Sequence, residues 1–328
     1  MNGAGDSERP IEISVVIPCL NEEENAGAIC AAVTAELERH APCYEIILID
    51  NGSTDRTREI IRGLCVANPR VRAIFNTRNF GQMRSPTYAI YQAEGAAVIA
   101  MCADFQDPPT LIGALIERWR AGAKIVLGVR RTETAPVMFG AMRRVGYGFL
   151  ERNADYPVVP GATGFGLFDS TVVDTLAAWH EPEPFFRGML IESGYPLSLI
   201  HYDRPVRAGG ASKNDLPALL DFAVSGLAGS SKGLLRKPII WSLFAGIAAL
   251  VVLLVAAISA VAGGPVWPLL LLSNQIGLFA VLFLFLGLIG EQIRVISERT
   301  RYVPLVLESE RINFPEDRMQ PAGRSHVN

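Results

Sequence analysis

The sequence has few charged residues and no strong excess of either sign. Of its 328 residues, 19% are charged, and the formal net charge is −3. Proteins that bind nucleic acid generally present clustered Lys and Arg side chains to the phosphate backbone. The charge balance therefore argues against a general nucleic-acid-binding function.

Cysteine is scarce too, and its spacing suits neither a disulfide framework nor a zinc site. The chain has five cysteines and no C-x-x-C pair. This pattern predicts reduced thiols in a domain that faces the cytosol. Residues 1–10 are polar and lack the apolar core of a signal peptide, so we expect a flexible N-terminus there.

Charge is absent altogether from two long apolar stretches, Ile239–Ala262 and Val266–Gly290. A helix needs roughly 20 residues to cross the hydrocarbon core of a bilayer. Only Gly263–Pro265 separates the stretches, which suits a tight reversal. The pattern predicts a transmembrane hairpin over 238–290, with two buried core helices as the alternative.

Basic residues flank the predicted hairpin on both sides and are absent from its connecting loop. They are Lys232, Arg236 and Lys237 before it, and Arg294, Arg299 and Arg301 after it. By the positive-inside rule both chain ends lie in the cytosol, which places the protein in the cytoplasmic membrane. We expect 216–237 to lie along the membrane surface in contact with lipid, and 291–328 to form a cytoplasmic tail.

Residues 11–215 read as one domain that begins with alternating strands and helices. Short apolar strands with intervening amphipathic helices indicate a mostly parallel α/β sheet covered on both faces. We predict strands at 11–18, 44–50, 71–76, 96–103 and 123–129, and helices at 22–40, 54–67, 81–95 and 108–122.

Polar residues gather where the predicted strands end. Asp50 closes the second strand, and Asp104, Gln106 and Asp107 follow the fourth. Ligands of open α/β sheets bind beyond the carboxyl ends of the strands, so we expect Asp50 and Asp104 to converge there. Asp107 precedes two prolines and is typical of a helix N-cap.

Two carboxylates at this edge could serve a nucleotide diphosphate. One would accept hydrogen bonds from a base or ribose, and the other would hold Mg²⁺ or Mn²⁺ against the diphosphate. The first strand is not followed by a glycine-rich turn, and no Walker loop occurs anywhere in the chain. These absences exclude the common dinucleotide-binding and P-loop sites.

Four motifs in order resemble those of family 2 glycosyltransferases with the GT-A fold: "VVIPCLNEEEN", "IDNGSTDRT", "RNFGQMRS" and "CADFQDPP". With "FFRGML", "YDRPVRAGGASKN" and the hairpin, the chain is similar to the polyprenyl-phosphate sugar transferases. This subgroup contains dolichol-phosphate mannose synthase and bacterial O-antigen glucosyl-lipid synthases. The resemblance covers about residues 11–310.

The resemblance implies a role for each matching residue. Pro18, Leu20 and Glu22 would line the pocket of the nucleotide base, and Asp50 would recognise base or ribose. Asp104 and Gln106 would hold the metal. Phosphates of the donor or the acceptor would be contacted by four further residues: Arg130, Arg207, Ser212 and Lys213.

Three positions depart from the family's pattern. Cys102 stands where the first acid of the metal motif is expected, and Asn51 replaces a second carboxylate beside Asp50. Gly166 occupies the expected place of an arginine. A neutral thiol is a poor Mg²⁺ ligand, so we expect a weakened metal site.

The resemblance implies inverting transfer of a sugar from a nucleotide-diphosphate sugar to a polyprenyl phosphate, by a homo-oligomer at the membrane. Three alternatives stay open. One is a processive polysaccharide synthase, although its Q-x-x-R-W element is absent. The others are a general nucleotidyl- or phosphotransferase, and an inactive homologue that acts as a membrane scaffold or binds sugar nucleotides.

Overall fold

A computed structural model describes residues 11–131, 159, 161–203, 205 and 304–315, together with scattered positions of a helix between 271 and 296. The predictions for 1–10, 216–237 and Ile239–Ala262 lie outside these residues. Contacts divide the chain into two compact units. The first comprises 1–141, 159–215 and 302–328, and the second comprises 142–158 and 216–301.

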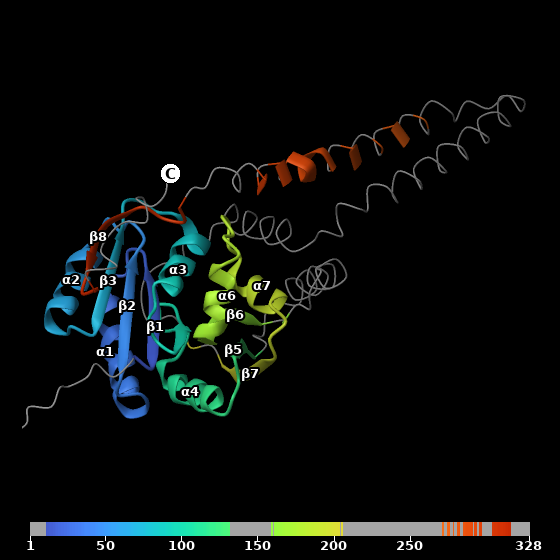
Figure 1. Ribbon diagram of the computed structural model, residues 1–328. Helices are drawn as coiled ribbons and strands as arrows, with labels where there is room; N and C mark the ends of the chain where they lie inside the picture. The colour runs from blue at the N-terminus through green and yellow to red at the C-terminus, as the bar shows by residue number, and fades with distance from the viewer. Residues whose placement is uncertain are drawn as a thin grey trace, which may run out of the picture. The chain divides into compact units, whose positions relative to one another are not determined.

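The first unit is built on an eight-stranded sheet with the order β7-β5-β6-β4-β1-β2-β3-β8 (Figure 1). The strands β1 to β4 are parallel to one another, and β5 and β7 are also parallel. The predicted mostly parallel α/β sheet is therefore confirmed. The strands are β1 (Ile13–Cys19), β2 (Tyr44–Asp50), β3 (Val71–Asn76), β4 (Ala97–Ala100), β5 (Ile125–Arg130), β6 (Ala162–Asp169), β7 (Leu197–Tyr202) and β8 (Glu308–Ile312).

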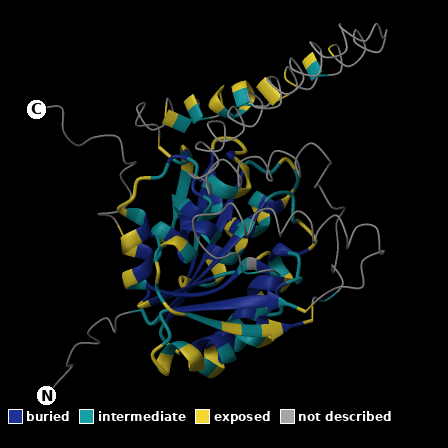
Figure 2. Ribbon diagram, turned by 90° about the vertical axis from the view of Figure 1, so that its right-hand side faces the viewer, coloured by how far each residue is buried: buried dark blue, intermediate teal, exposed yellow. Residues whose placement is uncertain are grey.

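Helices cover both faces of this sheet because the strands are apolar on both sides. In β1, Ile13, Val15 and Ile17 face one apolar cluster, whereas Val16 belongs to the other. The first cluster is closed by α1 (Ala26–His40), α2 (Thr57–Ala67) and α4 (Ile112–Arg120), and the second by α3 (Gly81–Tyr91), α6 (Ser170–Ala177) and α7 (Phe186–Glu192). A short 3-10 turn, η1 (Pro109–Leu111), leads into α4. Figure 2 shows the buried strands between the partly exposed helices.

Two strands do not follow the simple alternation that the sequence predicts. β6 lies between β4 and β5 and runs antiparallel to both. β8 comes from the far end of the chain and pairs antiparallel with β3 at the edge of the sheet. The tail between 304 and 315 thus contributes a strand to the domain that begins at residue 11.

Gly166 lies in β6 opposite Ala100 and Leu127, and the sheet leaves no room for a side chain there. A Cβ at this position would overlap with the carbonyl oxygen of Val126 and approach Leu127 Cα to 3.2 Å. A side chain at position 166 would therefore require the backbone of β5 to move. The glycine found here, where the resemblance implies an arginine, agrees with this packing.

Replacing Gly166 with alanine is expected to destabilise the domain by about 1–3 kcal/mol, because backbone atoms of β5 would have to move. Gly63 provides a matched control, since a Cβ at this α2 position meets no atom within 4 Å. Gly63→Ala should stabilise by about 0.5–1 kcal/mol. Thermal unfolding of the two full-length variants checks this, and equal melting temperatures would contradict the packing argument.

Within the described residues, no helix is both long and apolar enough to cross a bilayer. The first predicted span lies outside those residues, and the second, Val266–Gly290, is described only in part. The hairpin therefore stays a prediction.

Candidate active site

The first two strand-ends are joined by side-chain hydrogen bonds between their loops. Asn21, after β1, donates its backbone N–H to Ser53 Oγ and accepts the Thr54 N–H on its own Oδ1, both at 2.8 Å. Asn21 has a φ of 51°, a left-handed conformation that asparagine tolerates better than most residues. It is therefore a loop connector, whereas α1 begins later, at Ala26.

Pro18 lies near the end of β1, and Leu20 and Glu22 lie in the loop after it. All three are half-buried, so each keeps a part of its surface open. The backbone N–H of Glu22 donates to Thr57 Oγ1 at 2.8 Å, which ties the loop to the first turn of α2. The structure thus brings these three residues to the carboxyl edge of the sheet, as predicted. Their contact with a nucleotide base stays a prediction.

Asp50 ends β2, and its side chain is fully buried. Its carboxylate accepts hydrogen bonds from the Gly52 and Ser53 backbone N–H groups at 3.1–3.2 Å, and from Arg58 Nε at 2.7 Å. Arg58 also donates to the Asn76 carbonyl at the end of β3. In this structure Asp50 shapes the loop and joins two strand-ends through Arg58. Its convergence with Asp104 and its contact with a base or ribose stay predictions.

Asn51 is buried at the centre of an amide network. Its Oδ1 accepts the Phe80 N–H at 2.9 Å and Asn76 Nδ2 at 3.1 Å. Its Nδ2 donates to Asn79 Oδ1 at 2.8 Å and to the Gly81 carbonyl at 3.2 Å. A carboxylate at position 51 would have no proton for these last two acceptors, so the amide is the group that this network requires.

The loop after β4, residues 101–107, carries the predicted metal ligands. Asp104 is half-buried, and its Oδ1 accepts the Gln106 N–H at 3.1 Å. Phe105 between them has a φ of 60° and packs against the first apolar cluster. A bulky residue in the left-handed region costs energy, which the burial of its ring offsets. Because the partly buried Phe105 ring fixes this part of the loop, the backbone positions of its neighbours Asp104 and Gln106 are fixed as well.

Asp107 is not the helix cap that the sequence predicted, since Pro108 holds the cap position of η1. The residue is 1% exposed. Its Oδ2 accepts the Cys102 N–H at 3.0 Å, and its Oδ1 accepts the Tyr202 hydroxyl at 2.9 Å. Arg130 Nη2 lies 3.7 Å from the same Oδ1. Asp107 and Tyr202 are thus site residues that sequence reasoning missed.

The predicted Arg130 does reach this loop from the end of β5. It donates from Nε to the Tyr202 hydroxyl at 3.3 Å. Partial burial lowers the pKa of the guanidinium, but the hydrogen bond to Tyr202 and the charge of Asp107 outweigh it, so the pKa of Arg130 is raised. Arg130 therefore stays cationic beside the loop that holds Asp104.

Comparison with known proteins agrees with the order of these motifs. The model of glycosyl transferase family 2 matches residues 14–169. A bactoprenol glucosyl transferase of Shigella phage SfV is 31% identical over 301 residues, which cover 90% of this chain and 97% of the relative. The chain belongs to glycosyl transferase family 2. It is a glycosyltransferase, and the resemblance drawn from its motifs is confirmed.

Other relatives extend over similar lengths. An uncharacterized glycosyltransferase of Synechocystis is 31% identical over 318 residues, which cover 92% of this chain and 95% of the relative. A solved mannosyltransferase of Pyrobaculum calidifontis, in complex with GDP-Man and Mn²⁺, is 17% identical and covers 90% of this chain and 86% of its own, with a TM-score of 0.41.

The 101–107 loop offers few of the oxygen ligands that a divalent cation prefers. Cys102 is an exposed residue of this loop. Desolvation, and then the charges of Asp107 and Asp104, raise the pKa of its thiol. A neutral thiol does not suit Mg²⁺, which leaves Asp104 and Gln106 as the oxygen donors of this loop.

This donor set would hold a divalent cation only if oxygens from a bound ligand or from water completed its shell. Among the described residues, no group of three or more His, Cys, Asp or Glu side chains could hold a metal ion. One carboxylate with an amide is enough when phosphate oxygens and water complete the shell, as is usual for Mg²⁺. Arg207, Ser212 and Lys213, the other predicted phosphate contacts, lie outside the described residues.

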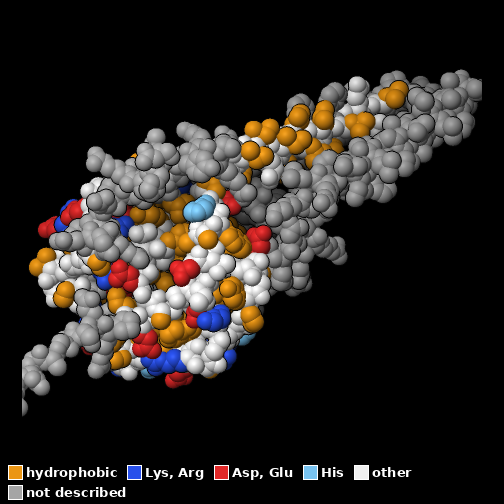
Figure 3. All heavy atoms as spheres, viewed as in Figure 1, with side chains coloured by type: hydrophobic (Ala, Val, Ile, Leu, Met, Phe, Trp, Pro, Cys, Tyr) orange, Lys and Arg blue, Asp and Glu red, His pale blue; other side chains and the backbone are white. Residues whose placement is uncertain are grey.

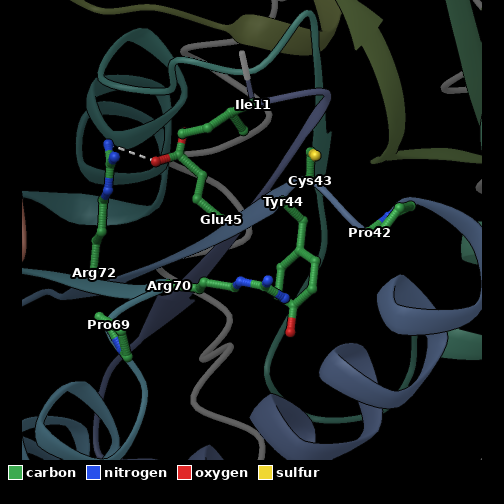
Figure 4. Close-up of a pocket in the computed structure, with 8 residues that line it drawn as sticks. All are labelled: Ile11, Pro42, Cys43, Tyr44, Glu45, Pro69, Arg70 and Arg72. Carbon is green, nitrogen blue, oxygen red and sulfur yellow. Dashed lines mark ion pairs between the residues drawn. The ribbon is translucent and has the colours of Figure 1, made fainter. Parts of the chain in front are cut away.

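A cavity of about 260 Å³ opens at the opposite edge of the sheet, where β2 and β3 begin. Figure 4 shows Glu45 and Arg72 directed toward each other in it and Arg70 beside Tyr44. Glu45 and Arg72 form an ion pair of 2.6 Å, so their charges compensate each other locally. This cavity is remote from the carboxyl ends of the strands and does not belong to the candidate active site.

Proposed function

We propose that the glycosyltransferase moves a sugar from a nucleotide-diphosphate sugar to a polyprenyl phosphate at the cytoplasmic face of a membrane. The observation that carries this proposal is the length of the similarity to the bactoprenol glucosyl transferase. The alignment spans 301 residues, and the predicted catalytic part, which ends at residue 215, is too short to contain them. The similarity must therefore extend into the two uncharged stretches.

The surface of the second unit supports a place in the membrane. Between 271 and 296, the described helical residues expose large apolar side chains at intervals of three or four along much of their length. These are Leu278, Leu282, Leu286, Ile289, Ile293 and Ile296, exposed by 38–61%. Figure 3 shows the hydrophobic side chains along this segment. Water does not favour such a surface, whereas lipid does. This supports the hairpin at 239–262 and 266–290. The proposed location of both ends in the cytosol rests on the basic residues that flank the hairpin.

The chemistry needs little help from a general base. The phosphate of the acceptor already carries a negative oxygen at neutral pH and can attack the anomeric carbon directly, with inversion. Arg130, Arg207 and Lys213 would orient the phosphates, and Asp104 with Gln106 would hold a divalent cation at the diphosphate. That cation would stabilise the negative charge of the departing nucleoside diphosphate. A homo-oligomer stays part of this proposal.

Two of the three departures that suggested an inactive homologue have structural explanations. Asn51 is the amide that its network requires, and Gly166 fills a position with no room for a side chain. Only Cys102 remains as a difference at the metal site. An active enzyme with a modest affinity for metal is therefore the better interpretation.

The test is transfer from radiolabelled UDP- and GDP-sugars into organic-extractable lipid, by membranes that contain the full chain and added polyprenyl phosphate. We expect label in the lipid fraction with Mg²⁺ or Mn²⁺ and none with EDTA. Mild acid should release the labelled sugar from the product, because the proposed link is a glycosyl phosphate. Label found only in a water-soluble polymer would instead favour the processive synthase, and label in neither fraction would favour the scaffold.

A further inference from the structure

Three residues from separate parts of the chain form a hydrogen-bonded chain beside the 101–107 loop. Tyr202 donates its hydroxyl proton to Asp107 Oδ1 at 2.9 Å and accepts a hydrogen bond from Arg130 Nε at 3.3 Å. The direct separation of Arg130 Nη2 and Asp107 Oδ1 is longer, at 3.7 Å. The tyrosine hydroxyl is therefore the group through which the cation and the carboxylate are joined.

The sheet fixes the place of this hydroxyl. Arg130 and Tyr202 are register partners at the ends of β5 and β7. The Tyr202 ring is 5% exposed and packs edge-on against Phe165, with ring centroids 5.6 Å apart and an interplanar angle of 80°. A ring held in this way has little freedom, so its hydroxyl oxygen occupies a defined position.

Asp107 transmits that position to the loop. One of its oxygens receives the Tyr202 hydroxyl, and the other receives the Cys102 N–H at the start of the loop, at 3.0 Å. The Asp107 carboxylate thus joins the end of the loop to its beginning at Cys102, and Asp104 and Gln106 lie between these two residues. A shift of its carboxylate would move the loop that presents these two residues.

We propose that Tyr202 is a positioning residue of glycosyl transfer, which orients both the loop of Asp104 and the guanidinium of Arg130 for the diphosphate of the donor. The inference deepens the proposed function and rests on it only for the binding of a nucleoside diphosphate at this loop. Tyr202 acts through Asp107 and Arg130 and needs no contact with the substrate. The hydroxyl is suited to this role because it is both donor and acceptor, which neither of its partners is in its charged state.

The Tyr202→Phe variant removes the hydroxyl and keeps the ring against Phe165. Without the bridging oxygen, we expect Arg130 to close directly onto Asp107 and turn away from the diphosphate. The Mn²⁺ concentration for half-maximal binding of UDP or GDP should rise about tenfold to a hundredfold, and kcat should fall by a similar factor. The KM for polyprenyl phosphate should stay unchanged.

Tyr91→Phe is the matched control. Tyr91, at the end of α3, is a half-buried tyrosine, and its ring packs edge-on against Phe186 of α7. We expect it to keep the metal dependence and the kcat of the unmodified protein. Equilibrium dialysis with labelled UDP or GDP gives the binding readout without any acceptor. A failure of the proposed lipid acceptor would thus appear in the transfer assay alone and leave this test intact.

A double-mutant cycle with Asp107→Asn separates positioning from a loss of folding. When two residues act through one another, the double variant loses less metal affinity than the sum of the losses in the two single variants. We therefore expect the Tyr202→Phe and Asp107→Asn effects on Mn²⁺ dependence to be strongly non-additive in variants with matched thermal unfolding. The inference would be overturned if Tyr202→Phe kept the metal dependence of the unmodified protein, or if the effects of the two substitutions were additive. It would also be overturned if the unmodified protein bound neither UDP nor GDP.

Discussion

Replacing Asp104 with asparagine is expected to reduce sugar transfer by about 100- to 1,000-fold. Asp104 is half-buried at the centre of the 101–107 loop, and the other acid of that loop, Asp107, is engaged with Cys102 and Tyr202. Cys102 offers a sulfur atom, which is a poor ligand for Mg²⁺. Asp104 is thus the carboxylate of this loop that is left to hold a divalent cation.

The measurement is transfer of labelled sugar into lipid at increasing Mn²⁺, for the unmodified protein and for the Asp104→Asn variant. The amide introduced by this substitution still has an oxygen that can accept the Gln106 N–H, so the loop should keep its shape while the charge is lost. High Mn²⁺ should restore the variant in part, because the donor diphosphate still binds the ion.

Asp174→Asn is the control for the same chemical change at an exposed position of α6. It should transfer sugar at the unmodified rate. If Asp104→Asn retained full activity at low Mn²⁺, the assignment of Asp104 as the metal-binding carboxylate would be wrong.

The second large effect concerns stability and the tail of the chain. Phe314→Ala is expected to destabilise the catalytic domain by about 3–5 kcal/mol. Phe314 is 4% exposed and belongs to the same apolar cluster as Ile74 of β3. The guanidinium groups of Arg72 and Arg311 lie over its ring, at 5.3 Å and 4.6 Å from the centroid. Removing the ring leaves a cavity and withdraws the support of both cations.

The tail is bound to the edge of the sheet by more than this ring. The Thr77 N–H donates to the Leu307 carbonyl at 2.9 Å, and Asn313 Nδ2 donates to the Cys65 and Val71 carbonyls at 2.8 Å. Arg311 bonds to Glu308, to Tyr88 of α3 and to Gln92 directly after α3. These bonds make residues 304–315 part of the catalytic fold.

Thermal unfolding of the full-length variants is the test, and a loss of 3–5 kcal/mol corresponds to a decrease in melting temperature of roughly 6–20 °C. Leu307→Ala, in the same tail, is the control because Leu307 is 56% exposed and should change the melting temperature little. Equal melting temperatures for the two variants would show that the tail does not contribute to the core.

The sequence by itself determined the local elements and the edge of the sheet at which the site lies. Runs such as 44–50 are apolar on both faces and lie between amphipathic helices, which only a covered parallel sheet can bury. Because parallel strands end at one edge, the position of Asp104 at that edge followed from the pattern alone, whereas Arg130 was identified through the family resemblance. The motifs also identified the family, since several loops of that edge carry them.

The tertiary structure decided which distant segments pair and which polar groups are already engaged. The insertion of β6 between β4 and β5, and the addition of β8 to β3, depend on hydrogen bonds between segments far apart in sequence. The periodicity of apolar residues along the sequence predicts whether a residue is buried, but it does not predict which distant residue packs against it. For the same reason the sequence pattern of Asp107 predicted a helix cap and did not show its contact with Tyr202, nor did it show the bond between Asp50 and Arg58.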